Sequence, residues 1–271
     1  MSVSASLPGR RRRRLGVPPA VGAAIVVAWV LAIAAEVTGR AALLGHGALI
    51  EGRGPSRPPP PVWVAVPLFL AAWQVMVIAM MLPSSLPLVR LFRAASMKAP
   101  RARAAMTAFL GGYVMVWTAF GALAFLLDIG IHRLVDRTPW LALHPYVIGG
   151  ATLVLAGAFQ FSALKDRCLR ECRRPEGFLL GRYARGLAAA FRLGREHGLY
   201  CLGCCWALML LMFAAGVANL VWMGWLTLVM VIEKTLHAGD RAVGAVGFAL
   251  IILGALVLAH QPQLSALFQA R

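Results

Sequence analysis

Long apolar stretches alternate with short polar and basic segments along this chain. A hydrocarbon core of about 30 Å needs roughly 20 consecutive apolar residues in a helix, and most of the stretches approach that length. The pattern therefore predicts an all-α fold, a polytopic transmembrane helical bundle that forms one integral membrane domain over residues 1–271. The seven predicted spans are 17–35, 62–82, 106–127, 146–164, two within 198–234, and 243–259.

The fifth and sixth spans come from one stretch, residues 198–232, which holds no charge over 35 residues. One helix of that length would overrun the core, whereas two full spans would need about 40 residues. A hairpin near residues 216–219 resolves this if the sixth helix continues through Lys234. Glu233 would then lie inside the membrane boundary, where an isolated carboxylate is costly. We expect it to pair with Lys165, Lys234 or a bound metal ion.

Polar and proline-rich segments set the remaining boundaries. A basic tail, residues 1–16, precedes the first span, and this arrangement also fits a cleavable signal peptide, which would leave six spans. The length of the apolar stretch favours a retained helix. The connector 36–61 ends in "GRGPSRPPPP", a stiff extended spacer, and Pro83 is expected to end the second span.

Composition and charge place the chain in a membrane. Of its residues 60% are hydrophobic and 14% charged, whereas soluble domains carry about 25% charged residues. The net charge is +17, but the basic residues are spread over short connectors, which suits anionic lipid headgroups. Nucleic-acid binders instead gather them on one face. The expected partner is therefore the lipid bilayer and not nucleic acid.

The distribution of basic residues also predicts orientation. With the N-terminus in the cytoplasm, the inner segments hold 21 of the Lys and Arg residues and the outer segments six, as the positive-inside rule requires. The basic loop 165–197 is then cytoplasmic and the connector 36–61 periplasmic. We expect a multi-pass protein of a bacterial inner membrane with a cytoplasmic N-terminus.

All five cysteines fall at the predicted cytoplasmic edge of the membrane. Cytoplasmic thiols are normally kept reduced, and thiolates select soft or borderline ions such as Cu(I) and Zn(II). Residues four apart share a helix face, and a helix start favours the thiolate. These features predict a metal site, most favourably for Cu(I), with Zn(II) second. Its candidate ligands are Cys168 and Cys172 after the fourth span and Cys201, Cys204 and Cys205 opening the fifth.

Four further residues are candidate auxiliary ligands. Met80 and Met81 lie at the cytoplasmic end of the second span, and thioethers ligate Cu(I), although methionine is also a common packing residue. His197 precedes Cys201 by one helical turn. Glu233 is expected at the depth of the thiols.

Three blocks of the sequence carry a resemblance: "WQVMVIAMMLPSSLP", "FQFSALKDRCLRECRRPEGF" and "REHGLYCLGCCWALMLLMFAAGVANLVWMGWLTLVMVIEK". They resemble a family of bacterial proteins described as predicted metal-binding integral membrane proteins, some of them labelled copper chaperones. The resemblance covers about residues 73–234. It implies metal binding by Met80, Met81, Lys165, Cys168, Cys172, His197, Cys201, Cys204, Cys205, Glu233 and Lys234.

The expected function is binding, delivery or transport of Cu(I), with a metal donor or acceptor protein as partner. An enzyme is less favoured, because the sequence has no phosphate loop, nucleophile motif or paired catalytic carboxylates. Two alternatives stay open. The "CLGC" motif also fits a membrane thiol–disulfide oxidoreductase, and a structural or assembly subunit would use its cysteines only for packing.

Overall fold

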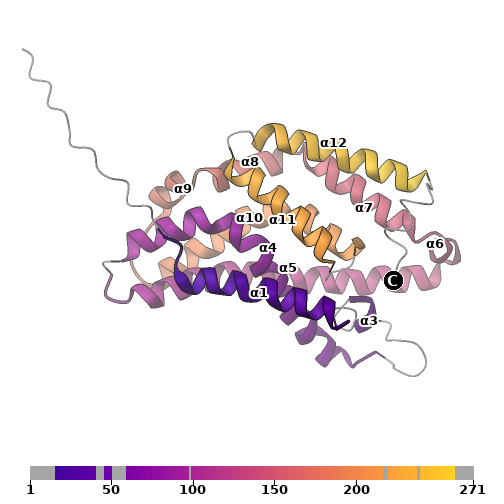
Figure 1. Cartoon of the computed structure of the whole chain (residues 1–271), viewed down its shortest axis with the longest axis horizontal. Coiled ribbons are helices and arrows are strands. Elements are labelled where there is room, and N and C mark those ends of the chain that lie inside the picture. Colours follow the sequence, from indigo (N-terminus) through magenta and orange to yellow (C-terminus); the bar gives the residue numbers. More distant parts are fainter. Residues whose placement is uncertain are drawn as a thin grey trace, which may run out of the picture.

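Helices account for all of the secondary structure in the described part of the chain (Figure 1). The structure is a computed structural model, and it describes residues 16–40, 46–50, 59–97, 99–215, 219–236 and 239–259. The helices are α1 (Pro19–Val37), α3 (His46–Ile50), α4 (Val62–Ser96), α5 (Ala102–Arg137), α6 (Pro139–Leu143), α7 (Tyr146–Phe159), α8 (Ala163–Arg173), α9 (Pro175–Arg182), α10 (Leu187–Ala215), α11 (Leu220–Thr235) and α12 (Gly239–Leu258).

The predicted all-α membrane bundle is confirmed. Among the described helices, α1, α4, α5, α10 and α12 are long and apolar enough to cross a membrane, and the pair α7–α8, bent by 63°, makes a sixth if it is one span. α11 has 16 residues, about 24 Å by helical rise, which is short of a full core. A bundle of about seven spans agrees with these lengths.

The second span does not end at Pro83, so that prediction is wrong. α4 continues through Pro83 and Pro87. A proline lacks the N–H that would bond the carbonyl four residues earlier, which here belongs to Ala79. The Trp29 side chain of α1 supplies the missing donor, since its Nε1–H donates to the Ala79 carbonyl at 3.1 Å. Tertiary contact thus satisfies the freed backbone group, and the helix runs on.

The predicted hairpin lies where the charge-free stretch required it. α10 ends at Ala215 and α11 begins at Leu220, while residues 216–218 lie outside the described part. The Asn219 side chain caps α11 by accepting the N–H groups of Val221 and Trp222. α11 then continues through Lys234, as expected.

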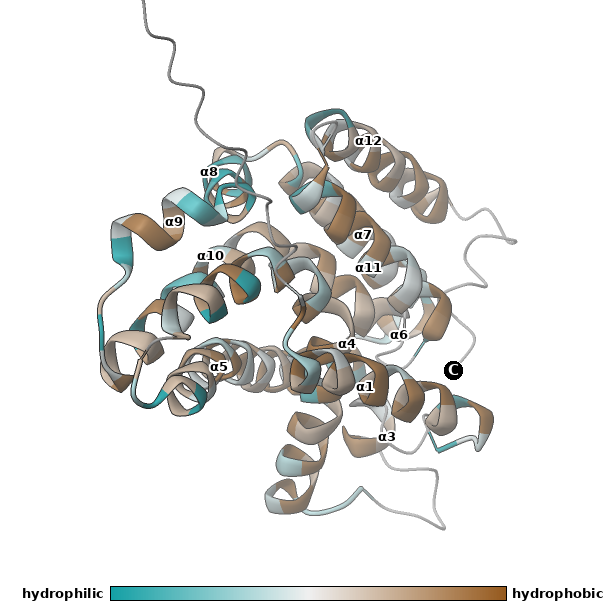
Figure 2. Ribbon diagram, turned by 60° about the vertical axis from the view of Figure 1, so that its left-hand side comes forward, coloured by the Kyte–Doolittle hydropathy of each residue, from teal (hydrophilic) through white to brown (hydrophobic). Residues whose placement is uncertain are grey.

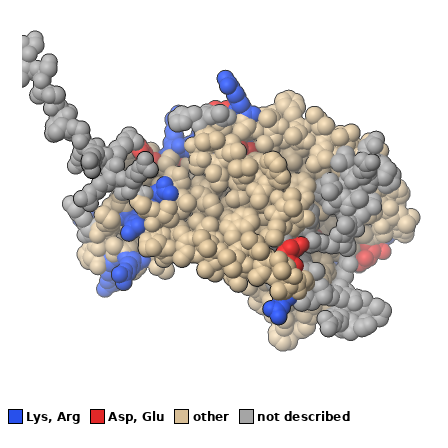
Figure 3. Space-filling view, viewed as in Figure 1, with Lys and Arg blue, Asp and Glu red and all other residues tan. Residues whose placement is uncertain are grey.

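The basic segment 165–197 is helical over most of its length. It contains most of α8, all of α9 and the start of α10, which begins at Leu187 instead of at the predicted residue 198. Figure 2 shows polar residues concentrated on α8, α9 and the start of α10, whereas α7 and α12 are mainly apolar. In Figure 3, most of the visible Lys and Arg lie toward the end formed by these polar helices.

α5 and α10 pack with their backbones in close contact. A Cβ atom added at Gly112 would lie 2.1 Å from the carbonyl oxygen of Phe191, and one added at Gly194 would lie 1.8 Å from that of Phe109. Only glycine fits such an approach, which is a principal source of helix–helix stability in lipid. The contact joins the first third of α5 to the start of α10, ahead of the part of α10 that carries the cysteines.

Candidate metal centre

Three thiols form a continuous set of sulfur contacts between α8 and α10. The Sγ atoms of Cys172 and Cys204 are 4.0 Å apart, and those of Cys204 and Cys205 are 3.4 Å apart. Two thiolates that share a tetrahedral ion at about 2.3 Å stand roughly 3.8 Å apart. The observed separations therefore lie near the spacing of thiols that share one ion.

All five cysteines are free thiols, and they are largely shielded from solvent. Cys201, Cys204 and Cys205 are at most 1% exposed, whereas Cys172 is partly exposed. Cys168 is buried against α10, since a Cβ atom added at Gly203 would lie 2.5 Å from its sulfur. Both cysteine segments identified in the sequence therefore meet at one junction.

The expectation that the thiols open a helix is wrong. Cys201 lies 14 residues beyond Leu187, the first residue of α10, and the influence of a helix terminus fades within its first turn. Burial also opposes a charged thiolate unless a cation stands beside it. The positive group beside the thiols is instead a lysine from α11, where the sequence analysis had expected the positive end of a helix.

That lysine is Lys234, whose Nζ lies 3.1 Å from the Cys201 sulfur and 3.1 Å from the Ser84 hydroxyl of α4. The Tyr113 hydroxyl of α5 lies 3.2 Å from the same sulfur and accepts a hydrogen bond from Ser85 at 3.3 Å. Four helices thus converge on Cys201. Within the membrane-embedded part of the fold, this is a buried polar network around one sulfur.

Glu233 pairs with Lys165, one of the cations that the sequence proposed. The Lys165 Nζ is 2.7 Å from Glu233 Oε2, and both side chains are 1% exposed. Ser162 caps α8 by accepting the backbone N–H of Lys165, and Arg173 donates to the Glu233 carbonyl at 2.6 Å. Because α8 and α11 are joined by these bonds, the pair fixes α8 beside the thiols.

The two candidate methionine ligands lie in the apolar core beside the cysteines. Met80 and Met81 are fully buried in the apolar cluster that contains Cys201, Cys204 and Cys205. They precede Ser84 and Ser85 by one turn of α4. This position is compatible with an auxiliary ligand and equally with packing.

His197 lies inside an aromatic pocket. Its ring centroid is 5.6 Å from that of Tyr113, 5.7 Å from that of Phe178 and 6.4 Å from that of Phe109. Its Nε2 is buried without a hydrogen-bond partner in the described structure. More generally, no group of three or more His, Cys, Asp or Glu side chains within the described ranges is arranged to hold a metal ion. The thiols are gathered, but their arrangement among the described residues is not that of a complete metal site.

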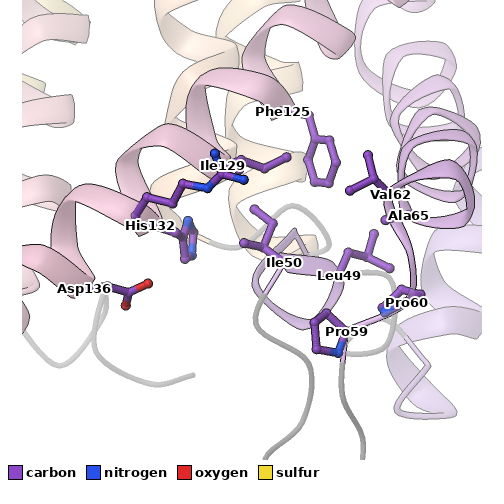
Figure 4. A pocket seen from close by; sticks show the side chains of 11 residues that line it. Leu49, Ile50, Pro59, Pro60, Val62, Ala65, Phe125, Ile129, His132 and Asp136 are labelled. Carbon is purple, nitrogen blue, oxygen red and sulfur yellow. The ribbon is translucent and has the colours of Figure 1, made fainter.

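A cavity of about 410 Å³ lies elsewhere, between α3, the start of α4 and the end of α5 (Figure 4). Of the α5 residues that line the cavity, Phe125 is the one nearest in sequence to Tyr113, and it lies about 18 Å from Tyr113 along the helix by helical rise. His132 and Asp136 face it beside the apolar residues Leu49 and Ile50. None of the candidate ligands lines this cavity, so it is separate from the thiol junction.

The sequence analysis did not identify Tyr113, Ser84 and Ser85 as residues of this polar network. Tyr113 follows Gly111 and Gly112 in the charge-free stretch 106–127. A tyrosine after a glycine pair is a usable signal, because the glycines allow a close helix contact. The two serines follow Pro83 and resemble ordinary helix-end residues. Their role depends on α4 continuing past the proline.

The fold and the junction define a polytopic helical membrane protein with a buried cluster of thiols. A model of the copper chaperone family PpoB2 matches residues 70–257, and the chain belongs to this family, in agreement with the resemblance in its sequence. The match spans all five cysteines together with Met80, Met81, His197 and Glu233. Comparison with curated proteins and with solved structures gave no match.

Proposed function

We propose that this protein binds Cu(I) at the junction of α8 and α10 and exchanges it with a donor or acceptor protein. The central ligands are Cys172, Cys204 and Cys205, whose sulfur contacts of 4.0 and 3.4 Å are the observation that carries the proposal. Cys168 and Cys201 flank them as further thiol ligands. Met80, Met81, His197 and Glu233 are auxiliary positions. The family description, copper chaperone, supports copper as the cargo.

The donor set favours Cu(I) over Zn(II). Thiolates and thioethers are soft ligands, and they select Cu(I). A structural zinc site takes four ligands in a closed tetrahedron, and the further ligands named above would be needed to complete it. Zn(II) is therefore the second candidate.

Metal content provides the test. Full-length protein, purified without oxygen in lipid nanodiscs and supplied with Cu(I), is expected to retain about one ion per chain against a Cu(I) chelator, because burial slows ligand exchange. Elemental analysis measures the ratio. A metal-free protein would contradict the proposal. A reversible disulfide between Cys201 and Cys204 with dependence on a quinone would support an oxidoreductase instead.

We also propose that the protein lies in a bacterial inner membrane with its N-terminus and the α8–α9 end in the cytoplasm. The basic residues on that end support this orientation. Cysteines introduced at the exposed positions Arg185 and Trp140 provide the test, because the native thiols are mostly buried. An impermeant thiol reagent added to cells is expected to label the Trp140→Cys variant at once and the Arg185→Cys variant only after permeabilisation. The reverse result would place the thiols on the periplasmic side.

A further inference from the structure

A second cavity lies at the basic end of the bundle, where the end of α4, the start of α5 and the connector between α9 and α10 meet. Its volume is about 500 Å³, within the range of small-molecule sites, roughly 300–1,000 Å³. None of the candidate metal ligands lines it, so it is separate from the thiol junction. The chemistry of its lining indicates what it binds.

Two arginines carry the charge of this lining. They are Arg101 and Arg185, and no carboxylate is among the described residues that line the cavity. Both arginines are exposed, and no ion pair joins either one to a carboxylate in the described part of the chain. A guanidinium group binds a phosphate group through two parallel N–H donors. The lining therefore favours a phosphate anion.

The backbone adds to this positive potential. Arg101 is the N-cap of α5, and Gly186 directly precedes Leu187, the first residue of α10, so both helix starts border the cavity. No acidic residue lies in the first turn of either helix, and no side chain caps the start of α5. The N–H groups at a helix start carry a partial positive charge, which here reinforces that of the arginines.

Most of the remaining lining is apolar and well packed. Phe92 and Tyr183 line the cavity. The ring of Phe92 stacks on that of Phe109 with centroids 4.6 Å apart, and the Tyr183 hydroxyl donates to the Ala95 carbonyl at 3.2 Å. These contacts join the end of α4 to α5 and to the connector before α10. The cavity thus combines cations with an apolar wall.

The cavity also lies at the level of the lipid headgroups. Ala105 lines it and directly precedes the charge-free stretch 106–127, which we assign to the hydrocarbon core. Arg101 lies one helical turn before Ala105, in the polar layer that borders this core. A free phosphate would leave the apolar wall unused, whereas a phospholipid brings a phosphate group and hydrocarbon together.

We propose that this cavity binds the headgroup of an anionic phospholipid, with the phosphate at Arg101 and Arg185 and the glycerol region against Phe92 and Ala95. A zwitterionic lipid also carries a cationic group, which the two arginines repel. The site therefore selects lipids of net negative charge. It goes beyond the proposed copper function and does not depend on it.

Retention of lipid provides the test. Metal-free, full-length protein is placed in nanodiscs of equal amounts of phosphatidylcholine and phosphatidylglycerol and extracted into mild detergent, and the bound lipid is identified by native mass spectrometry. The wild type is expected to retain about one phosphatidylglycerol per chain in preference to phosphatidylcholine. The double variant Arg101→Gln, Arg185→Gln is expected to retain at least about tenfold less. Ala95→Phe, which fills the cavity without changing the charge, is expected to lose the lipid as well.

The matched control is Arg103→Gln, which removes an exposed cation from the first turn of α5 that does not line the cavity. It is expected to retain phosphatidylglycerol as the wild type does. An equal loss in this control would show diffuse attraction to a basic surface, and full retention by the double variant or by Ala95→Phe would place the lipid elsewhere. Either result overturns the proposal.

Inorganic phosphate separates the two sources of the anion. Added to the wild type at the same ionic strength as a chloride control, it is expected to leave the lipid bound, because it cannot contact the apolar wall as a lipid does. Release by phosphate but not by chloride would show that the cavity takes the free anion, and the lipid proposal would then be wrong.

Discussion

The Cys204→Ser variant is expected to retain less than about a tenth of the Cu(I) that the wild-type protein holds against a chelator, because a hydroxyl is a poor ligand for a soft ion. Cys204 has the largest expected effect because its sulfur contacts those of both Cys172 and Cys205. Its removal separates the thiol of α8 from those of α10. Elemental analysis after dialysis measures the loss.

The control for this variant is Met212→Leu, which removes another fully buried sulfur from α10, two turns further along the helix. It is expected to retain copper as the wild type does. Thermal unfolding in detergent establishes that both variants are folded. Equal copper retention by the two would show that Cys204 is a packing residue, and the assembly-subunit alternative would then gain support.

The second large effect concerns stability. Separate Lys165→Met and Glu233→Leu variants each leave one buried group of the 2.7 Å pair without its counter-charge. Each is expected to lose about 3–5 kcal/mol in the free energy of unfolding, whereas a double Lys165→Met, Glu233→Leu variant is expected to recover most of it, since an apolar pair of similar volume replaces a buried ion pair at little cost.

Denaturant unfolding in mixed micelles measures these differences. The double-variant cycle isolates the coupling between the two side chains from their separate burial. Additive losses, with the double variant worse than either single one, would mean that the pair contributes nothing as a pair. Lys165 and Glu233 would then act independently.

The sequence predicted the membrane spans because their length follows from the thickness of the hydrocarbon core. The predicted limits of the first span differ from those of α1 by only two residues, and the hairpin before Leu220 follows from the same arithmetic. The partner of Glu233 was also among the predicted ones, because a carboxylate at that depth needs a cation. These predictions depend only on properties that can be counted along the sequence, namely the length of an apolar stretch and the position of its charges.

Features that depend on two helices at once were not predictable in this way. Pro83 is a reliable stop only while the carbonyl of Ala79 has no other donor, and that donor, Trp29, lies 50 residues earlier in the chain. Cys201 was placed at a helix start because the polar residues of α10 resemble a loop. Tyr113 and Lys234 meet at one sulfur only after α5, α10 and α11 pack together.

Glycines bring the backbones of α7 and α12 together, since a Cβ atom added at Gly157 would lie 2.8 Å from the carbonyl oxygen of Gly247, and one added at Gly254 would lie 2.9 Å from that of Gly150. Gly247 also lies against the bend that precedes α8, where an added Cβ atom would come within 2.9 Å of the Cβ of Gln160 and 2.7 Å of the ring of Phe161. α12 carries no cysteine, yet its surface lies against the bend from which α8 begins. A methyl group at position 247 would have to displace Gln160 or the ring of Phe161, and any movement of that bend would pass along α8 to Cys172, whose sulfur is 4.0 Å from that of Cys204.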